Sequence, residues 1–183
     1  MVIEIIKESY VIDEPIENIR PRFDAKLKKS LLDFLEEVKM KEGFSTIPLP
    51  EIKLITIDEL FDMLGARALI VKGFYSAENE AIFIPYNELD SVENLLHEFY
   101  HHIQLKKYGM KHFPKEELDK PHCQRSYEHE AKEFALRTAP KYKSKYIETL
   151  KTHFKMKRAL IATGRINGMI VKSYLTALIP KDP

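Results

Sequence analysis

Two histidines four residues apart, with a glutamate directly after the first, form the pattern in this chain that most directly indicates chemistry. His97-Glu98-Phe99-Tyr100-His101 is an H-E-x-x-H sequence. Positions i and i+4 of an α-helix lie one turn apart on the same face, so His97 and His101 can bind one ion together. Neutral imidazoles are zinc ligands, and a catalytic zinc ion takes three protein ligands and one water. The motif therefore predicts a zinc site that includes His97 and His101.

Glu98 is the residue that this pattern assigns to catalysis. It lies at an azimuth next to the two imidazoles, close enough to contact a water bound to the metal. Zinc lowers the pKa of such a water towards about 7, and a glutamate can then take its proton. Composition alone gives about 0.03 chance occurrences of the motif in this chain. The alternative interpretation is a helix with two surface histidines.

A third ligand is expected on a second helix, over residues 124–138. This helix contains the segment Y-E-H-E-A-K-E-F-A, which begins at Tyr127. The carboxylates of Glu128 and Glu130 lie at opposite edges of its buried stripe, each about 80° from the centre of the stripe. Helical geometry does not choose between these two glutamates. The alternative is that all three glutamates of the segment, which also contains Glu133, are solvated.

The H-E-x-x-H helix with a glutamate on a downstream helix resembles the gluzincin-type zinc metallopeptidases. The segment E-H-E-A-K-E-F-A is similar to the E-x-E-A-x-x-F-A element of the small ImmA/IrrE-type metallopeptidases and to the glutamate helix of minimal archaeal gluzincins. The resemblance covers about residues 68–138. It implies that the third ligand is Glu128, three residues before Ala131. Lys132 stands where the family often has an Asp or Asn that orients a histidine.

The resemblance also implies how substrate and transition state are bound. An edge strand above the zinc, here residues 80–84, would pair with an extended peptide. A donor for the oxyanion is also expected. Four side chains near the glutamate in sequence could supply it, and none of them is distinguished: Tyr127, His122, Arg125 and His129.

The elements that must position these residues alternate between helices and short strands. Apolar spacing predicts helices over 24–40, 58–65, 90–108, 124–138, 141–162 and 165–179, and strands over 1–12, 52–57, 68–75 and 80–84. Residues 13–21 are expected to form a linker. Asp90 with Glu93 resembles a capping box, and Gly109 is expected to end that helix. The helix over 124–138 is expected to stop before Pro140.

This order predicts an α+β fold in a single domain over residues 1–183. The resemblance implies a zincin-like layout, in which a small twisted sheet with an edge strand over the active site packs on the H-E-x-x-H helix and the downstream glutamate helix. The core is expected over about 44–140, with an N-terminal strand and helix over 1–43 and extra C-terminal helices over 141–183. The apolar stripe of the last helix could complete the core, form a dimer or cover the active site.

Composition limits the function classes. The net charge of +1 argues against a whole-protein nucleic-acid binder. No apolar run approaches the roughly 18 residues of a membrane span, and the N-terminus does not have a signal-peptide pattern, so a cytoplasmic location without membrane contact is expected. The one cysteine, Cys123, cannot form an internal disulfide. Its thiolate could cap the zinc in a latent form, or the thiol could be idle.

Together these patterns predict a zinc-dependent metalloendopeptidase, with one Zn²⁺ per chain and an intracellular protein or peptide as substrate. The alternative is a zinc-containing regulatory or binding module with little proteolytic activity, which would contact DNA or a partner protein through the basic region over 137–158. A purely structural metal is a third hypothesis. Structural zinc sites normally have four protein ligands, often cysteines, which argues against it.

Overall fold

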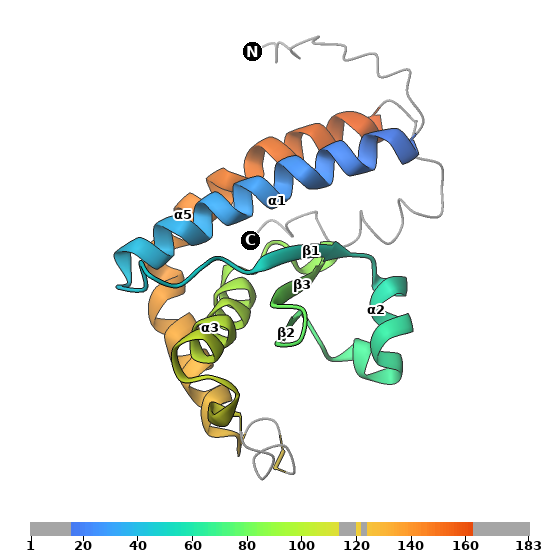
Figure 1. Cartoon of the computed structure of the whole chain (residues 1–183). Helices are drawn as coiled ribbons and strands as arrows, with labels where there is room; N and C mark the ends of the chain where they lie inside the picture. The colour runs from blue at the N-terminus through green and yellow to red at the C-terminus, as the bar shows by residue number, and fades with distance from the viewer. Residues whose placement is uncertain (1–15, 114–119, 122–123, 163–183) are drawn as a thin grey trace.

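The chain folds as an α+β protein, as its order of elements predicts (Figure 1). The computed structural model describes residues 16–113, 120–121 and 124–162. The helices are α1 (Ile16–Lys41), α2 (Ile57–Leu64), α3 (Val92–Tyr108) and α5 (Ser126–Ala162), and the strands are β1 (Glu51–Ile55), β2 (Phe74–Ser76) and β3 (Ala81–Pro85). The predicted strand over 1–12 and helix over 165–179 lie outside the described residues, as do His122 and Cys123. None of the described helices is long and apolar enough to cross a membrane.

The sheet has the strand order β1-β3-β2. β1 runs parallel to β3, and β2 runs antiparallel to β3. The expectation that residues 80–84 form the edge strand is therefore wrong, because β3 lies between the other two strands. β2 is the edge strand that adjoins β3 along the chain. The parallel pairing of β1 with β3 joins segments about 30 residues apart, and such non-local pairing is not visible in local sequence patterns.

The strand expected over 68–75 is also shorter than predicted. β2 begins only at Phe74, and the apolar residues before it lie in a 3-10 helix, η1 (Gly65–Leu69), and in the turn that follows. The side chains of Leu69 and Ile70 are 75% and 83% exposed, whereas Ala68 is buried. An apolar run without clear alternation does not distinguish a strand from a helical turn.

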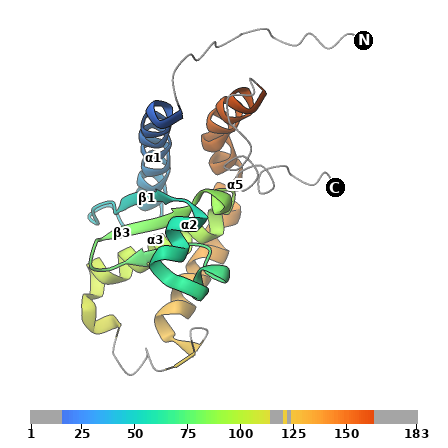
Figure 2. The same ribbon diagram turned by 90° about the vertical axis from the view of Figure 1, so that its right-hand side faces the viewer.

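Both faces of the sheet are covered by helices (Figure 2). Because successive side chains of a strand point to opposite faces, Ile82 and Ile84 of β3 enter the main core, and Ala81 and Phe83 enter a second cluster. The second cluster includes Leu60 of α2, which lies in front of the sheet in Figure 2. The main core is built with α1, α3 and α5 and includes residues on both sides of the range 44–140.

The helix that carries the H-E-x-x-H motif has a defined start and end. Its N-cap is Ser91, whose Oγ accepts a hydrogen bond of 3.2 Å from the backbone N–H of Asn94. The cap expected at Asp90 is therefore displaced by one residue. Gly109 ends the helix at a φ of 70°, a conformation that favours glycine. The motif thus lies in the middle of a capped helix, where its spacing is regular.

The predicted end of the glutamate helix before Pro140 is wrong. α5 continues through Pro140 to Ala162 as one helix. Ala139, Tyr142 and Tyr146 are buried on both sides of the proline, against a core that includes α1. Packing of a continuous apolar face therefore outweighs the one backbone hydrogen bond that Pro140 removes. α1 begins at Ile16, inside the expected linker, and contains Pro21.

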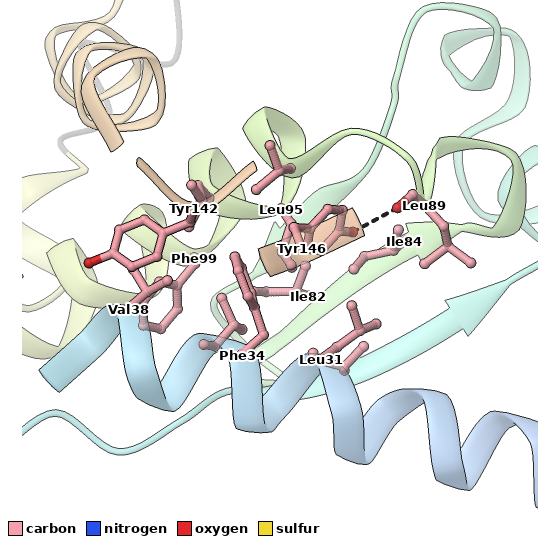
Figure 3. Close-up of a cluster of buried hydrophobic side chains, with 14 of the residues drawn as sticks. Leu31, Phe34, Val38, Ile82, Ile84, Leu89, Leu95, Phe99, Tyr142 and Tyr146 are labelled. Carbon is pink, nitrogen blue, oxygen red and sulfur yellow. Dashed lines mark hydrogen bonds between the residues drawn. The ribbon is translucent and has the colours of Figure 1, made fainter. Parts of the chain in front are cut away.

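Aromatic side chains fill the space between α1, α5 and the sheet (Figure 3). The ring centroids of Phe34 and Tyr146 lie 5.0 Å apart. Tyr146 is 1% exposed, and its hydroxyl donates a hydrogen bond of 2.7 Å to the backbone carbonyl of Leu89. Burial raises the pKa of Tyr146, so this phenol remains protonated and can act as a donor. The bond ties α5 to the segment just before α3.

Candidate metal centre

Three side chains from α3 and α5 meet with one potential ligand atom each. His97 and His101 extend from the middle of α3, and Glu128 lies in the first turn of α5. Oε2 of Glu128 lies 3.1 Å from Nε2 of His97 and 3.2 Å from Nε2 of His101, and the two imidazole nitrogens are 3.1 Å apart. Among the described residues, these three form the group of His, Cys, Asp and Glu side chains that could hold a metal ion.

The three atoms fit a zinc ion. A tetrahedral ion with bonds of about 2.0–2.1 Å places its ligand atoms about 3.3 Å apart, close to the separations of 3.1–3.2 Å seen here. Two imidazoles with one carboxylate are a known ligand set of catalytic zinc. The position of Glu128 in the first turn of α5 also stabilises its negative charge, because the N-terminal end of a helix carries partial positive charge.

The structure separates the two glutamates that helical geometry alone leaves equivalent. Glu128 is 8% exposed and lies against both imidazoles. Glu130 contacts other residues. Its Oε2 accepts hydrogen bonds of 2.9 Å from Nε2 of Gln104 and 3.1 Å from Nε2 of His112. Glu128 is therefore brought together with the histidines, as the resemblance implies, and Glu130 is not.

Glu98 lies beside this cluster, where the charges of His97, His101 and Glu128 act on its carboxylate. Burial is the largest influence on the pKa of Glu98 and raises it, and the negative charge of Glu128 also raises it. The charges of His101 and His97 and a hydrogen bond from the backbone of Tyr75 lower this pKa, but the net shift is upward. A carboxyl whose pKa is raised holds a proton more readily than an ordinary one. Burial alone would lower the pKa of His101, but the hydrogen bond with Glu128 and the charges of Glu98 and Glu128 outweigh it and raise this pKa.

Residues that the sequence did not single out hold the cluster in place. Nδ1 of His101 lies 2.9 Å from Oε1 of Gln104, which is fully buried. His112 is half-buried, and its Nε2 lies 3.1 Å from Oε2 of Glu130. Gln104 lies three residues after His101 and seven after His97, so a helical projection of α3 places it on the same face and could have found it.

His102, next to His101 in α3, is buried and forms hydrogen bonds outside the cluster. Its Nε2 donates a hydrogen bond of 2.8 Å to the carbonyl of Pro48, so its Nδ1 accepts the bond of 3.0 Å from the hydroxyl of Tyr75. Burial lowers the pKa of His102 and raises the pKa of Tyr75 to about 12. Both groups thus stay neutral, and they tie α3 to β2 and to the segment before β1.

The residues that the sequence offers as oxyanion donors differ in their burial and in their contacts with the cluster. Tyr127 is buried beside the cluster, with its ring centroid 5.9 Å from that of His101. Its hydroxyl accepts a hydrogen bond of 3.3 Å from Nη1 of Arg125, whose Nε donates to the carbonyl of Lys120. His129 is exposed. Of these residues, Tyr127 is the one whose ring contacts the cluster, and Arg125 contacts Tyr127.

The basic region expected to contact DNA or a partner carries its own counter-charges. Nζ of Lys141 lies 2.9 Å from a carboxylate oxygen of Glu42, and Lys145 pairs with Glu37 of α1. Lys151 pairs with Glu148 at 2.6 Å. These contacts reduce the net positive charge of this face where its side chains are described, up to residue 151.

No protein-family model, curated protein or solved structure matches this chain. The function of the site is therefore inferred from its own residues and from the pattern of its sequence.

Proposed function

We propose that this chain is a zinc-dependent metallopeptidase of the gluzincin type, in which His97, His101 and Glu128 bind one zinc ion and Glu98 is the general base. One observation carries the proposal: Nε2 of His97, Nε2 of His101 and Oε2 of Glu128 lie within 3.2 Å of one another, on an H-E-x-x-H helix and a downstream glutamate helix. Three protein ligands without cysteine are typical of catalytic rather than structural zinc.

In the proposed reaction, the zinc ion would activate the water and Glu98 would transfer its proton. When bound, zinc acidifies a water and polarises the carbonyl of the scissile peptide bond. Glu98 takes the proton released as the water attacks and passes it to the leaving nitrogen. His97, His101 and Glu128 hold their ligand atoms on two helices that pack together, so the geometry is set before substrate binds.

The position of the edge strand β2 is consistent with a peptide as the substrate. The backbone of Tyr75 in β2 donates a hydrogen bond to Glu98, so the outer edge of this strand faces the proposed general base. Among the described residues no strand pairs with that edge. β2, rather than residues 80–84, is thus the strand in this proposal to which an extended peptide would add. The zincin-like character of the fold is part of the same proposal.

Metal analysis combined with a cleavage assay tests this function. We expect about one zinc per chain in wild type, and cleavage of casein or another unfolded protein. Glu128→Ala should lose both the metal and the activity. Glu133→Ala, an exposed glutamate of the same helix, is the matched control and should keep both. Absence of zinc from wild type after reconstitution would contradict the proposal, and zinc without cleavage of any protein would contradict its peptidase part.

A further inference from the structure

A chain of polar side chains leads from His101 to the surface across the contact between α3 and α5. Nδ1 of His101 lies 2.9 Å from Oε1 of Gln104. Nε2 of Gln104 donates to Oε2 of Glu130 at 2.9 Å and to the backbone carbonyl of Tyr127 at 3.0 Å. Nε2 of His112 lies 3.1 Å from the same oxygen of Glu130. Gln104 is fully buried, whereas the side chain of Glu130 is 43% exposed.

The partners of Gln104 determine the direction of each hydrogen bond. A carboxylate and a backbone carbonyl are both acceptors, so the NH₂ group of Gln104 must face Glu130 and Tyr127. The amide oxygen must then face His101. Because this oxygen can only accept, Nδ1 of His101 must carry a proton. The lone pair of a neutral His101 is therefore on Nε2, the atom that lies beside Glu128 and His97.

We propose that Gln104, oriented by Glu130 and by the Tyr127 carbonyl, is the positioning residue that fixes the tautomer and the ring plane of His101. The two glutamates of the E-H-E segment then have complementary tasks: Glu128 contacts the imidazoles directly, and Glu130 acts through Gln104. The consequence for metal affinity rests on the proposed zinc site, but the proton on Nδ1 does not. Partners of this kind typically change metal affinity 10–100-fold when they are removed.

Zinc affinity, measured by competition with a chromogenic chelator, tests the consequence for the metal. Gln104→Leu keeps the buried volume and removes the acceptor, so we expect zinc to bind about 10–100-fold more weakly. Ile103→Val is the matched control, because Ile103 is buried next to Gln104 in α3 and its truncation loosens the same helix. Its zinc affinity should equal that of wild type. Equal affinities of Gln104→Leu and wild type would overturn the proposal.

An exchange of residue types tests the link between Gln104 and Glu130. In Gln104→Glu a carboxylate can still accept from His101, but it faces the carboxylate of Glu130 and repels it, so zinc should bind more weakly than in wild type. In the double variant Gln104→Glu with Glu130→Gln, the amide at position 130 can donate to the carboxylate at position 104. Recovery of part of the lost affinity is expected. A double variant no better than Gln104→Glu would overturn the role of Glu130.

A measurement on the metal-free protein separates this inference from the proposed function. Despite its burial, contacts with Glu128 and Glu98 raise the pKa of His101, so the long-range ¹H–¹⁵N spectrum is recorded at a pH where His101 is neutral. The spectrum then identifies which imidazole nitrogen carries the proton. We expect the Nδ1 proton of His101 to be present in wild type and protected from exchange by its bond to Gln104, and to lose that protection in Gln104→Leu. A neutral His101 that carries its only proton on Nε2 in wild type would overturn the inference, even if the protein binds zinc and cleaves peptides. The expected spectrum in a protein without peptidase activity would contradict only the proposed function.

Discussion

At the scale of single residues, three carboxylates close to one another have three different environments. Glu128 is buried between two imidazoles, with hydrogen-bond distances of 3.1 and 3.2 Å. Burial raises the pKa of Glu98, which stands beside them. Glu130 is half-exposed and bonded to Gln104 and His112. Environment rather than residue type sets the protonation and the partners of a carboxylate, so these three glutamates differ in both.

Glu98→Gln tests the role of the general base at this scale. The amide keeps the size of the side chain but cannot take a proton, so zinc content should stay at the wild-type level while kcat/KM falls by about 10²–10⁴-fold. Steady-state cleavage of a peptide that the wild type hydrolyses provides the measurement. Glu93→Gln changes an exposed glutamate in the first turn of the same helix and should have no effect. A Glu98→Gln variant as active as wild type would rule out Glu98 as the base.

At the scale of elements, the site depends on how α3 and α5 pack together. α3 supplies two groups of the cluster and α5 supplies the third. α5 also extends far past Glu128 and buries Tyr142, Tyr146 and Leu150 in the main core. α5 therefore links its first turn, where Glu128 lies, to the main core. Substitutions distant from the cluster can therefore report on how firmly α5 is held.

Tyr146→Phe should weaken the attachment of α5. The substitution removes a buried hydroxyl that donates 2.7 Å to the Leu89 carbonyl, and it should lower the free energy of unfolding by about 1–2 kcal/mol. Urea unfolding followed by circular dichroism measures this change. Tyr108→Phe is the comparison, because Tyr108 is 46% exposed, and this substitution should change the free energy of unfolding by about 0.5 kcal/mol or less. Equal effects of the two substitutions would argue against this account of the Tyr146 bond.

Pro140→Ala should increase the free energy of unfolding, because it stabilises the α5 helix itself. Proline inside a helix removes one backbone hydrogen bond and strains the preceding turn, at a cost of about 3 kcal/mol, part of which is offset by its rigidity in the unfolded chain. We expect the variant to gain about 1–3 kcal/mol in the free energy of unfolding by urea. Ser144→Ala, an exposed change in the same helix, should stay within about 0.5 kcal/mol of wild type. A destabilised Pro140→Ala would instead show that the packing of α5 needs the local geometry of proline.

At the scale of the whole molecule, the proposed zinc ion would join two helices that come from separate parts of the chain. His101 and Glu128 are 27 residues apart in sequence, and the segment between them includes residues that the structure does not describe. A ligand that binds the folded state and not the unfolded chain stabilises the fold by mass action. Metal binding should therefore be visible in global stability and not only in activity.

Zinc should raise the thermal midpoint of the wild-type protein. At free zinc about a thousand times the dissociation constant, the stabilisation is about 4 kcal/mol. Differential scanning fluorimetry with and without zinc measures the shift, and a strong chelator should reverse it. Glu128→Ala should show little or no shift, whereas Glu133→Ala should behave like wild type. An unchanged midpoint in wild type at saturating zinc would argue that the ion does not select the folded state.

The sequence by itself determined the features that depend on local periodicity. The spacing of His97 and His101 placed both imidazoles on one helical face, and Gly109 marked the end of that helix, because helical geometry and its termination are set by neighbouring residues. The alternation of helices and short strands was sufficient for the α+β class. Ser91 instead of Asp90 as the N-cap is an error of one residue, of the size expected at helix ends.

Only the tertiary structure decided the features that depend on contacts between distant segments. The resemblance implied Glu128, but the geometry of one helix leaves Glu128 and Glu130 equivalent, and the contact of Glu128 with the histidines follows from how α5 packs against α3. The central position of β3 comes from parallel pairing with β1, and the passage of α5 through Pro140 comes from a buried stripe that packs within the core shared with α1. Packing and strand pairing are non-local, and their free energies exceed the local preferences that a sequence displays.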